Sequence, residues 1–376
     1  MRRALTVAAA AATALLLAAT PATAHGGRPT PKPPTVTDIA DGLVSPLTLA
    51  AGPRGTTFVT QNFASLLTSV GRDGATRVLY TGGAGNDVGG VSFSGRTVTF
   101  TETVLAEGEQ PEPIDSMVKT LRVDRNGAPA GPARTLVDLR AWENAHNPDG
   151  NVTYGLRHAP QSCLDQFPAE MPGRYTGVQD SHPYATTTRH GTTYVADAGM
   201  NAVVSVSDRG RVRAVAVLPA QPVRVTAQAA AANGLPDCAV GRTYWFEPVP
   251  TDVEVGPRGK LYVTTLPGGP EDANLGARGA VYTVDPRWGS VRQVASGFLG
   301  ATNVAVSPHG EVYVAELFGG AITQATHRGH RTVLETPLPA GLEWDHGDLL
   351  ATTNVLPADD TTPPDGHLVR IDLPRW

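Results

Sequence analysis

Residues 249–266, with the sequence VPTDVEVGPRGKLYVTTL, decide the fold. Valines alternate with acidic residues from Asp252 to Val255, a Gly-Pro-Arg-Gly turn follows at residues 256–259, and a second apolar run begins at Leu261. Alternating apolar and polar residues on both sides of a short glycine-containing turn are typical of a β-hairpin. This stretch therefore predicts a strand, a tight turn and a second strand.

The same hairpin occurs twice more, as LTLAAGPRGTTFVT at residues 47–60 and as NVAVSPHGEVYVAE at residues 303–316. Three copies of one unit indicate a repeat architecture. A hairpin that cannot bury its own apolar face must stack on its neighbours, and copies so far apart favour blades around an axis over a single sandwich. We therefore expect an all-β chain, with residues 35–376 forming a six-bladed β-propeller.

The expected blades cover residues 43–80, 88–139, 182–218, 251–295, 302–334 and 341–372. The N-terminal strand, residues 36–40, should pair into the last blade and close the ring, because most propellers remove their open edges in this way. A seventh blade would have to be hidden in one of two insertions.

The insertions are residues 140–180 and 219–247, which lack the repeat, although residues 140–147 could form a short helix. Long irregular stretches in a compact domain are usually functional or pack as lids. Each insertion holds one of the two cysteines, Cys163 and Cys238. In an exported chain they most simply form a disulfide bond, which would join the insertions. Two separate buried thiols are the alternative.

The N-terminus has the three parts of a secretory signal peptide: Arg2 and Arg3, an apolar run, and a small-residue cleavage site ending at Ala24. We expect residues 1–24 to be removed and residues 25–34 to form a proline-rich tether. The apolar run is shorter than the ~20 residues that span a bilayer, and no later stretch is apolar and long enough. The predicted location is therefore extracytoplasmic, and the sequence leaves open Sec or twin-arginine export.

Charge and motifs narrow the function classes. A net charge of −5 and a pI near 6.1 give no electrostatic footprint for nucleic acid or an anionic membrane. The sequence has no Gly-x-Ser-x-Gly, His-Glu-x-x-His or Cys-x-x-Cys motif, so the usual hydrolase and zinc signatures are absent. Asp180, Ser181 and His182 are consecutive, and since neighbours on an extended chain point opposite ways, they cannot form a triad by themselves.

Polar residues at the starts of first strands and the ends of second strands should converge on one mouth of the propeller channel. Asp345 and His346 are expected at this level in the last blade. Convergent polar groups in a concavity are the default ligand site, and the alternative is that they hydrogen-bond backbone amides around a wet channel. The candidate ligand-binding residues are His182, Asp197, Asn201, Asp252, Asn303 and Glu316. Their oxygens suit calcium, although we expect no cofactor.

Several segments together resemble the ScyD/ScyE family of exported bacterial proteins. They are ENAHNPD at 143–149, SHPY at 181–184, YVADAGMN at 194–201, VPTDVEVGP at 249–257 and VYVAE at 312–316. The resemblance implies a six-bladed propeller and an extracytoplasmic location, and it implies little about activity. His182 stands where the family usually has asparagine.

The functional hypothesis is a secreted, monomeric binding or scaffold module rather than an enzyme. Its partner would be a small molecule or an extracellular protein, held at a mouth that the insertions cover. The alternative is a divalent-cation-dependent lactonase or esterase, similar to gluconolactonase-like propellers, in which calcium polarises a carbonyl group and Glu316 acts as the base.

Overall fold

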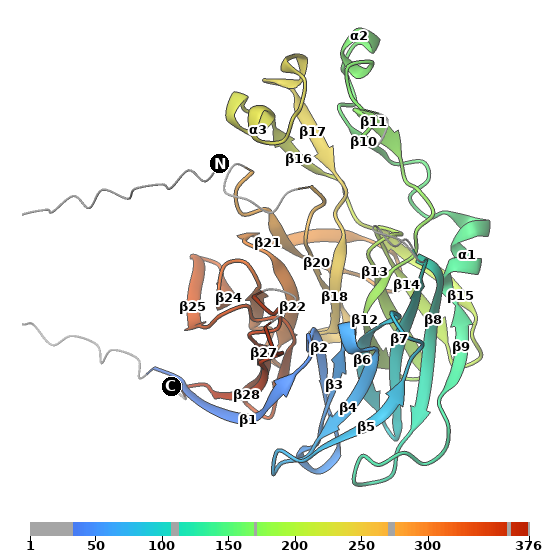
Figure 1. The fold of residues 1–376 in the computed structure, drawn as a ribbon, viewed down its shortest axis with the longest axis vertical. Coiled ribbons are helices and arrows are strands. Elements are labelled where there is room, and N and C mark those ends of the chain that lie inside the picture. The colour runs from blue at the N-terminus through green and yellow to red at the C-terminus, as the bar shows by residue number, and fades with distance from the viewer. Residues whose placement is uncertain (1–32, 107–112, 169–170, 270–274, 359–361, 375–376) are drawn as a thin grey trace, which may run out of the picture. The chain divides into compact units, whose positions relative to one another are not determined.

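The computed structural model describes residues 33–106, 113–168, 171–269, 275–358 and 362–374. The predicted signal peptide and most of the tether lie outside these residues. The compact unit Pro34–Trp376 contains seven four-stranded sheets (Figure 1). The sequence predicted six, and the additional sheet lies in the two insertions.

Five sheets consist of four strands that follow one another in the chain, as the repeated hairpin predicts. Their strands are β2 (Thr48–Ala51), β3 (Thr57–Gln61), β4 (Leu66–Val70) and β5 (Thr76–Thr81); β6 (Asp87–Ser94), β7 (Thr97–Leu105), β8 (Pro113–Arg122) and β9 (Arg134–Asp138); β12 (Pro183–Arg189), β13 (Thr192–Asp197), β14 (Ala202–Ser207) and β15 (Val212–Val217); β18 (Pro250–Val255), β19 (Leu261–Thr265), β20 (Gly279–Val284) and β21 (Val291–Phe298); and β22 (Ala301–Val306), β23 (Val312–Glu316), β24 (Ala321–Thr326) and β25 (Gly329–Glu335).

A sixth sheet joins the two ends of the unit. It contains β26 (Leu342–Asp345), β27 (Asp348–Thr353) and β28 (Gly366–Asp372), and β1 (Thr35–Leu43) pairs antiparallel with β28. This confirms the predicted pairing of the N-terminal strand. The first strands of these six sheets, β2, β6, β12, β18, β22 and β26, contact one another in that order, and β26 contacts β2. We call these six the ring sheets.

The repeated Gly-Pro-Arg-Gly turns adopt one local structure. Each forms a short 3-10 helix, η1 (Pro53–Gly55) and η4 (Pro257–Gly259), in which the arginine is left-handed, with φ of 56° at Arg54 and 59° at Arg258. In both turns the first glycine donates its N–H across the hairpin, from Gly52 to Thr56 O at 2.7 Å and from Gly256 to Lys260 O at 2.8 Å. Equal sequences thus give equal turns in two ring sheets.

The core lies between neighbouring ring sheets. Val253 and Val263, on β18 and β19, pack in one cluster with Ala196 and Val203, on β13 and β14. Each ring sheet therefore buries both faces. Burial of apolar surface contributes ~25 cal/mol per Å² to folding, so each sheet is stabilised by its neighbours.

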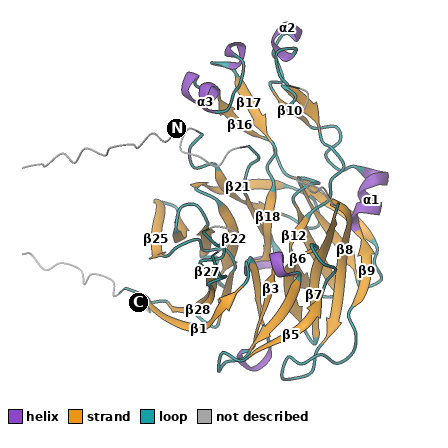
Figure 2. Ribbon diagram, in the orientation of Figure 1, coloured by secondary structure: helices purple, strands orange, loops and turns teal. Residues whose placement is uncertain are grey.

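The seventh sheet, which we call the insertion sheet, has the strand order β11-β10-β17-β16. Its strands are β10 (Thr153–Gly155) and β11 (Arg174–Thr176) from the first insertion, and β16 (Gln221–Arg224) and β17 (Thr243–Phe246) from the second. The helices α1 (Leu139–His146), α2 (Gln161–Leu164) and α3 (Ala227–Ala232) lie outside the ring sheets, and α2 and α3 sit at the far end of this sheet (Figures 1 and 2). The short helix predicted at residues 140–147 is thus confirmed as α1. The short helices η2 (Asn62–Ala64) and η3 (Asp237–Ala239) complete the list.

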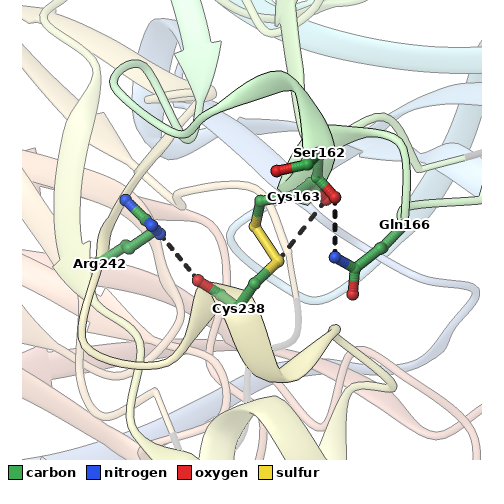
Figure 3. The surroundings of a disulfide bond; sticks show 5 residues. All are labelled: Ser162, Cys163, Gln166, Cys238 and Arg242. Carbon is green, nitrogen blue, oxygen red and sulfur yellow. Dashed lines mark hydrogen bonds between the residues drawn. A yellow bond between two sulfur atoms is a disulfide. The ribbon is translucent and has the colours of Figure 1, made fainter.

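A disulfide bond between Cys163 and Cys238 joins the two insertions, as the sequence predicted (Figure 3). The two Cα atoms are 5.7 Å apart and the cysteines are separated by 75 residues. Beside the bond, Arg242 Nε donates to the carbonyl oxygen of Cys238 at 2.8 Å. Closing a loop of this length restricts the unfolded chain and stabilises the fold by roughly 4 to 5 kcal/mol in the chain-entropy model. No helix in the described part of the chain is long and apolar enough to cross a bilayer.

Candidate functional site: a pocket where the ring sheets meet

Residues from the starts of first strands and the ends of second strands line one cavity of 350 Å³, which we call the mouth pocket. Most of its wall is apolar. Phe63 follows β3, Leu105 ends β7, and Leu266 follows β19. The end of the second strand supplies such a residue in five ring sheets, and Leu47 precedes β2. The repeat thus places a ring of large apolar side chains at this level: Leu47, Phe63, Leu105, Leu266, Leu317 and Leu356.

The threonines and Asn303 in the pocket wall hold ring sheets together. Thr251 Oγ1 donates to Ala301 O at 3.0 Å, and Thr302 Oγ1 donates to Ala340 O at 3.2 Å. Asn303 Oδ1 accepts from the Leu342 N–H at 3.1 Å. These polar groups already have partners in the next sheet. They therefore shape the pocket and leave little hydrogen-bonding capacity for a ligand.

The pair of His182 and Asp87 is the polar exception. His182 precedes β12 and Asp87 begins β6, and their Nε2 and Oδ2 atoms are 2.9 Å apart. The carboxylate accepts, so Nε2 carries a proton, and Nδ1 has no hydrogen-bond partner among the described residues. In the neutral imidazole Nδ1 is then an acceptor. The imidazole packs on Tyr184 with 4.4 Å between ring centroids. Asp87 Oδ1 is buried without a hydrogen-bond partner among those same residues.

A buried network fixes the loop that carries Asp87. Glu102 accepts from Asn86 Nδ2 at 2.7 Å and from the Tyr80 hydroxyl at 2.7 Å, and it pairs with Lys119 Nζ at 2.6 Å. Burial alone would raise the pKa of Glu102, but the hydrogen bonds from Lys119, Asn86 and Tyr80 hold that pKa below its ordinary value. The loop before β6 is therefore anchored by a charged group, which keeps Asp87 in reach of His182.

The structure places two of the six candidate residues, His182 and Asn303, in the lining of the mouth pocket. Asp252 and Glu316 serve the backbone instead. The two carboxylate oxygens of Asp252 accept the N–H groups of Val253 and Val304, each at 2.8 Å. Glu316 Oε2 accepts from the Leu299 N–H, also at 2.8 Å.

Asp197 and Asn201 lie at the junction between the ring sheets and the insertions. Asp197 is fully buried and accepts from the Ser181 hydroxyl at 2.7 Å and from the His182 N–H at 2.9 Å. Asn201 Nδ2 donates to Asp149 Oδ2 at 2.9 Å. Neither residue lines the mouth pocket, but Asp197 positions the backbone of His182.

One expected position is wrong. Asp345 ends β26 and His346 begins the turn to β27, where it is exposed. Ala340 is the residue of this segment that reaches the mouth pocket. The first strand of this sheet already spans Leu342–Asp345, so Asp345 and His346 lie at its end and not before it.

Three solved structures resemble the chain over about nine tenths of its length. A putative oxidoreductase (glucose dehydrogenase) from Thermus thermophilus is 17% identical over 90% of this chain and 99% of its own, with a TM-score of 0.53. The PQQ-bound aldose sugar dehydrogenase from Streptomyces coelicolor is 13% identical (91% and 99%, TM-score 0.51). The soluble aldose sugar dehydrogenase from Escherichia coli, in its apo form, is 10% identical (91% and 100%, TM-score 0.53).

The fold is a β-propeller. Identities this low show the fold alone and say nothing of the reaction. No family model matches the chain, and no curated protein matches it. The ScyD/ScyE resemblance is therefore supported only as far as the propeller itself.

Sequence reasoning missed a group of buried acids where the insertions leave the propeller. Glu143 lies on α1, Asp149 in the turn that follows, and Asp180 and Glu247 at the ends of the insertions. Burial raises the pKa of Glu143 to about 8, that of Asp180 to about 6 and that of Glu247 to about 7. Among the described residues no group of three or more His, Cys, Asp or Glu side chains is arranged to hold a metal ion. With a pKa of about 8, Glu143 is mostly protonated at pH 7, although Arg140 Nη1 lies 3.6 Å from its Oε2.

Two of these acids, Glu143 and Asp149, hydrogen-bond to other segments that resemble the ScyD/ScyE family. Asp149 belongs to ENAHNPD, Asn201 belongs to YVADAGMN, and the two side chains hydrogen-bond. Glu143 Oε2 accepts from the Ser181 N–H at 2.7 Å, which links α1 to the residue before His182. A search for acidic residues in the non-repeating segments would have singled them out as candidates. Such acids are buried only where hydrogen bonds or charges compensate for the loss of water.

Proposed function

We propose that this chain is an extracytoplasmic six-bladed propeller that binds a small, mainly apolar molecule in the mouth pocket. In this proposal the six ring sheets are the blades, because their first strands contact each other in a closed cycle. The insertion sheet is an accessory layer rather than a seventh blade, because its strands come from two segments that interrupt the cycle.

The observation that carries the proposal is the composition of the mouth pocket. Its 350 Å³ falls in the range of small-molecule sites, ~300–1,000 Å³. The apolar ring supplies burial for the body of a ligand, while the wall's threonines and Asn303 are already hydrogen-bonded. In the neutral imidazole, His182 Nδ1 is then an acceptor that can select a ligand, so the proposed ligand has an apolar body and a hydrogen-bond donor.

The test uses 1-naphthol, which combines an apolar ring system with one hydroxyl donor. Binding is measured by isothermal titration calorimetry for the full mature chain and for Phe63→Asp, His182→Ala and a control, Val294→Asp. Phe63 and Val294 are both exposed, so neither aspartate should disturb folding. We expect Phe63→Asp and His182→Ala to weaken binding about tenfold, which is ~1.4 kcal/mol, and the control to bind normally. Equal affinity in all four proteins would refute the mouth pocket as the site.

The pair of His182 and Asp87 favours one second candidate, a lactone or ester hydrolase. His182 Nδ1 would take a proton from water as the water oxygen attacks the carbonyl carbon, and would return the proton to the leaving alkoxide, while Asp87 orients the imidazole. The cation-dependent form expected from the sequence, with calcium on the carbonyl and Glu316 as the base, would need a different site, because Glu316 does not line the mouth pocket.

Two measurements separate this candidate from a binding module. Hydrolysis of a simple lactone, followed by proton release, should be abolished in His182→Ala if the candidate is right, and absence of turnover in the wild type removes it. A melt with calcium and with a chelator tests the metal, because a ligand that binds only the folded state raises the melting temperature. An unchanged melting temperature removes the calcium-dependent form.

A further inference from the structure

A second cavity, separate from the mouth pocket, lies between the insertion sheet and the loop after β19. It has a volume of 230 Å³ and shares no lining residue with the mouth pocket. Gly268 and Gly269 form its side toward the propeller, and α3 contributes Ala229. We call it the insertion pocket. Its size restricts it to a small ligand, since most ligand sites exceed ~300 Å³.

One face of the insertion sheet gives this pocket an aromatic wall. Tyr244 and Phe246 are two residues apart on β17, so they point to the same face, and their ring centroids are 4.5 Å apart. Val223 on β16 pairs directly with Tyr244 and shares that face. Tyr175 on β11 completes the wall beside Tyr244. The remaining lining is almost entirely aliphatic.

Glu247 is the single acid among the described residues that line the insertion pocket. It follows β17 directly, and its carboxylate has neither an ion pair nor a hydrogen bond among the described residues. Burial and the nearby carboxylates of Asp180 and Asp149 raise its pKa to about 7. An ionised carboxylate in apolar surroundings is unfavourable unless a cation accompanies it. The propeller thus holds an acid whose counter-ion the described part of the chain does not supply.

Arg278 is the positive group beside this wall, and it is engaged elsewhere. Its guanidinium stacks over the Phe246 ring, 4.7 Å from the centroid, and donates to the carbonyl oxygens of Gly268 and Pro267. It forms no ion pair with Glu247. Among the described residues, the charged and titratable groups around Glu247 are Asp180, Asp149, Tyr175, Tyr244 and Arg278, and none of them forms an ion pair with its carboxylate.

From the cavity, its aromatic wall and its unpaired carboxylate, we propose that the insertion pocket binds a small alkylated ammonium ion. The methyl groups of such a cation would lie against Tyr175, Tyr244 and Phe246, whose π faces attract positive charge. Glu247 would be its counter-ion. The insertions then form a second binding site, for organic cations, beside the site for apolar molecules at the mouth.

The experiment compares choline with 3,3-dimethyl-1-butanol, which has the same shape without the charge. Isothermal titration calorimetry with the full mature chain at pH 8.5, where Glu247 is ionised, should show choline binding at least tenfold more tightly. At pH 5.5 a proton on Glu247 replaces the cation, so the preference should fall. Failure of the wild type to bind choline, or equal affinity for the two compounds at pH 8.5, overturns the proposal.

Matched variants locate the site. Glu247→Gln keeps the shape and removes the charge, and it should abolish the preference for choline. Glu311→Gln removes the same charge from an exposed residue at the end of a ring hairpin, and it should leave the preference intact. Tyr175→Phe should retain choline binding, whereas Tyr175→Leu should weaken it several-fold. If Glu247→Gln binds choline as the wild type does, the cation lies elsewhere and the assignment of this pocket is wrong.

Discussion

The ring sheets and the insertion sheet both contain four antiparallel strands, but they are held together in different ways. In a ring sheet of four consecutive strands, a short turn fixes the register of each hairpin. In the insertion sheet, β10 and β17 come from different insertions, a whole ring sheet lies between them in the chain, and they are registered by one pair, Gly155 with Trp245. Long loops are entropically unfavourable to close, so the second kind of sheet depends on its disulfide bond and the first does not.

The largest effect should come from removing that bond. In the double variant Cys163→Ala, Cys238→Ala, the insertion sheet loses a constraint of about 4 to 5 kcal/mol in the chain-entropy model. We expect limited proteolysis, read by mass spectrometry, to cut first in the insertions while the ring sheets stay protected. The wild type under a reducing agent is the control and should behave alike. Cleavage that starts in a ring sheet would break the contrast.

Removing a hydrogen bond between two ring sheets should lower the free energy of unfolding of the whole propeller, by less than the loss of the disulfide bond. Asp252→Ala leaves the buried N–H groups of Val253 and Val304 without acceptors, at about 1 to 3 kcal/mol for each such group. Asn303→Ala leaves one buried N–H group, that of Leu342, without an acceptor, so we expect about half the loss of stability. Chemical denaturation measures both. A single transition is expected for each variant, and a loss confined to one sheet would show that the ring is not cooperative.

The junction between the two regions should depend on pH. The pKa of Glu143 is about 8 in the folded protein against an ordinary 4.5, so its stabilising contribution is complete below about pH 4.5 and is lost as the pH rises through 8. We expect the melting temperature to fall between pH 5.5 and 8.5, by an amount equivalent to about 1 to 3 kcal/mol. Glu143→Gln should flatten this dependence. An unchanged pH profile in that variant would mean that other acids control the junction.

The smallest effects belong to the repeated turns. Arg54 and Arg258 have left-handed backbones, which glycine adopts more easily. Arg54→Gly and Arg258→Gly remove the strain of a left-handed arginine, but glycine loses more conformational entropy on folding. We therefore expect each variant to raise the free energy of unfolding by no more than about 0.5 kcal/mol. His309 occupies the same place in the third hairpin without a positive φ, so His309→Gly should give no gain. A thermal melt of the three variants tests whether equal turns respond equally.

Prediction from the sequence worked best where structure is local. The ranges expected for the six blades agree with the ring sheets within a few residues, because each blade has alternating apolar patterns with turns beside them. It worked in part for the mouth pocket, where His182 and Asn303 were named. The apolar ring was missed, since a leucine after a strand, such as Leu266 or Leu317, looks like ordinary core until its neighbours are known.

The sequence alone determined the all-β class, the repeated hairpin, the closing pair of β1 and β28, and the pairing of Cys163 with Cys238. Only the tertiary structure decided that the insertions make a sheet, that His182 meets Asp87, and that Glu247 is left without a counter-ion in the described part of the chain. The reason is physical: a turn and an alternating strand are set by neighbours in the chain, whereas a pocket is made by residues whose distance in space has no fixed relation to their distance in sequence.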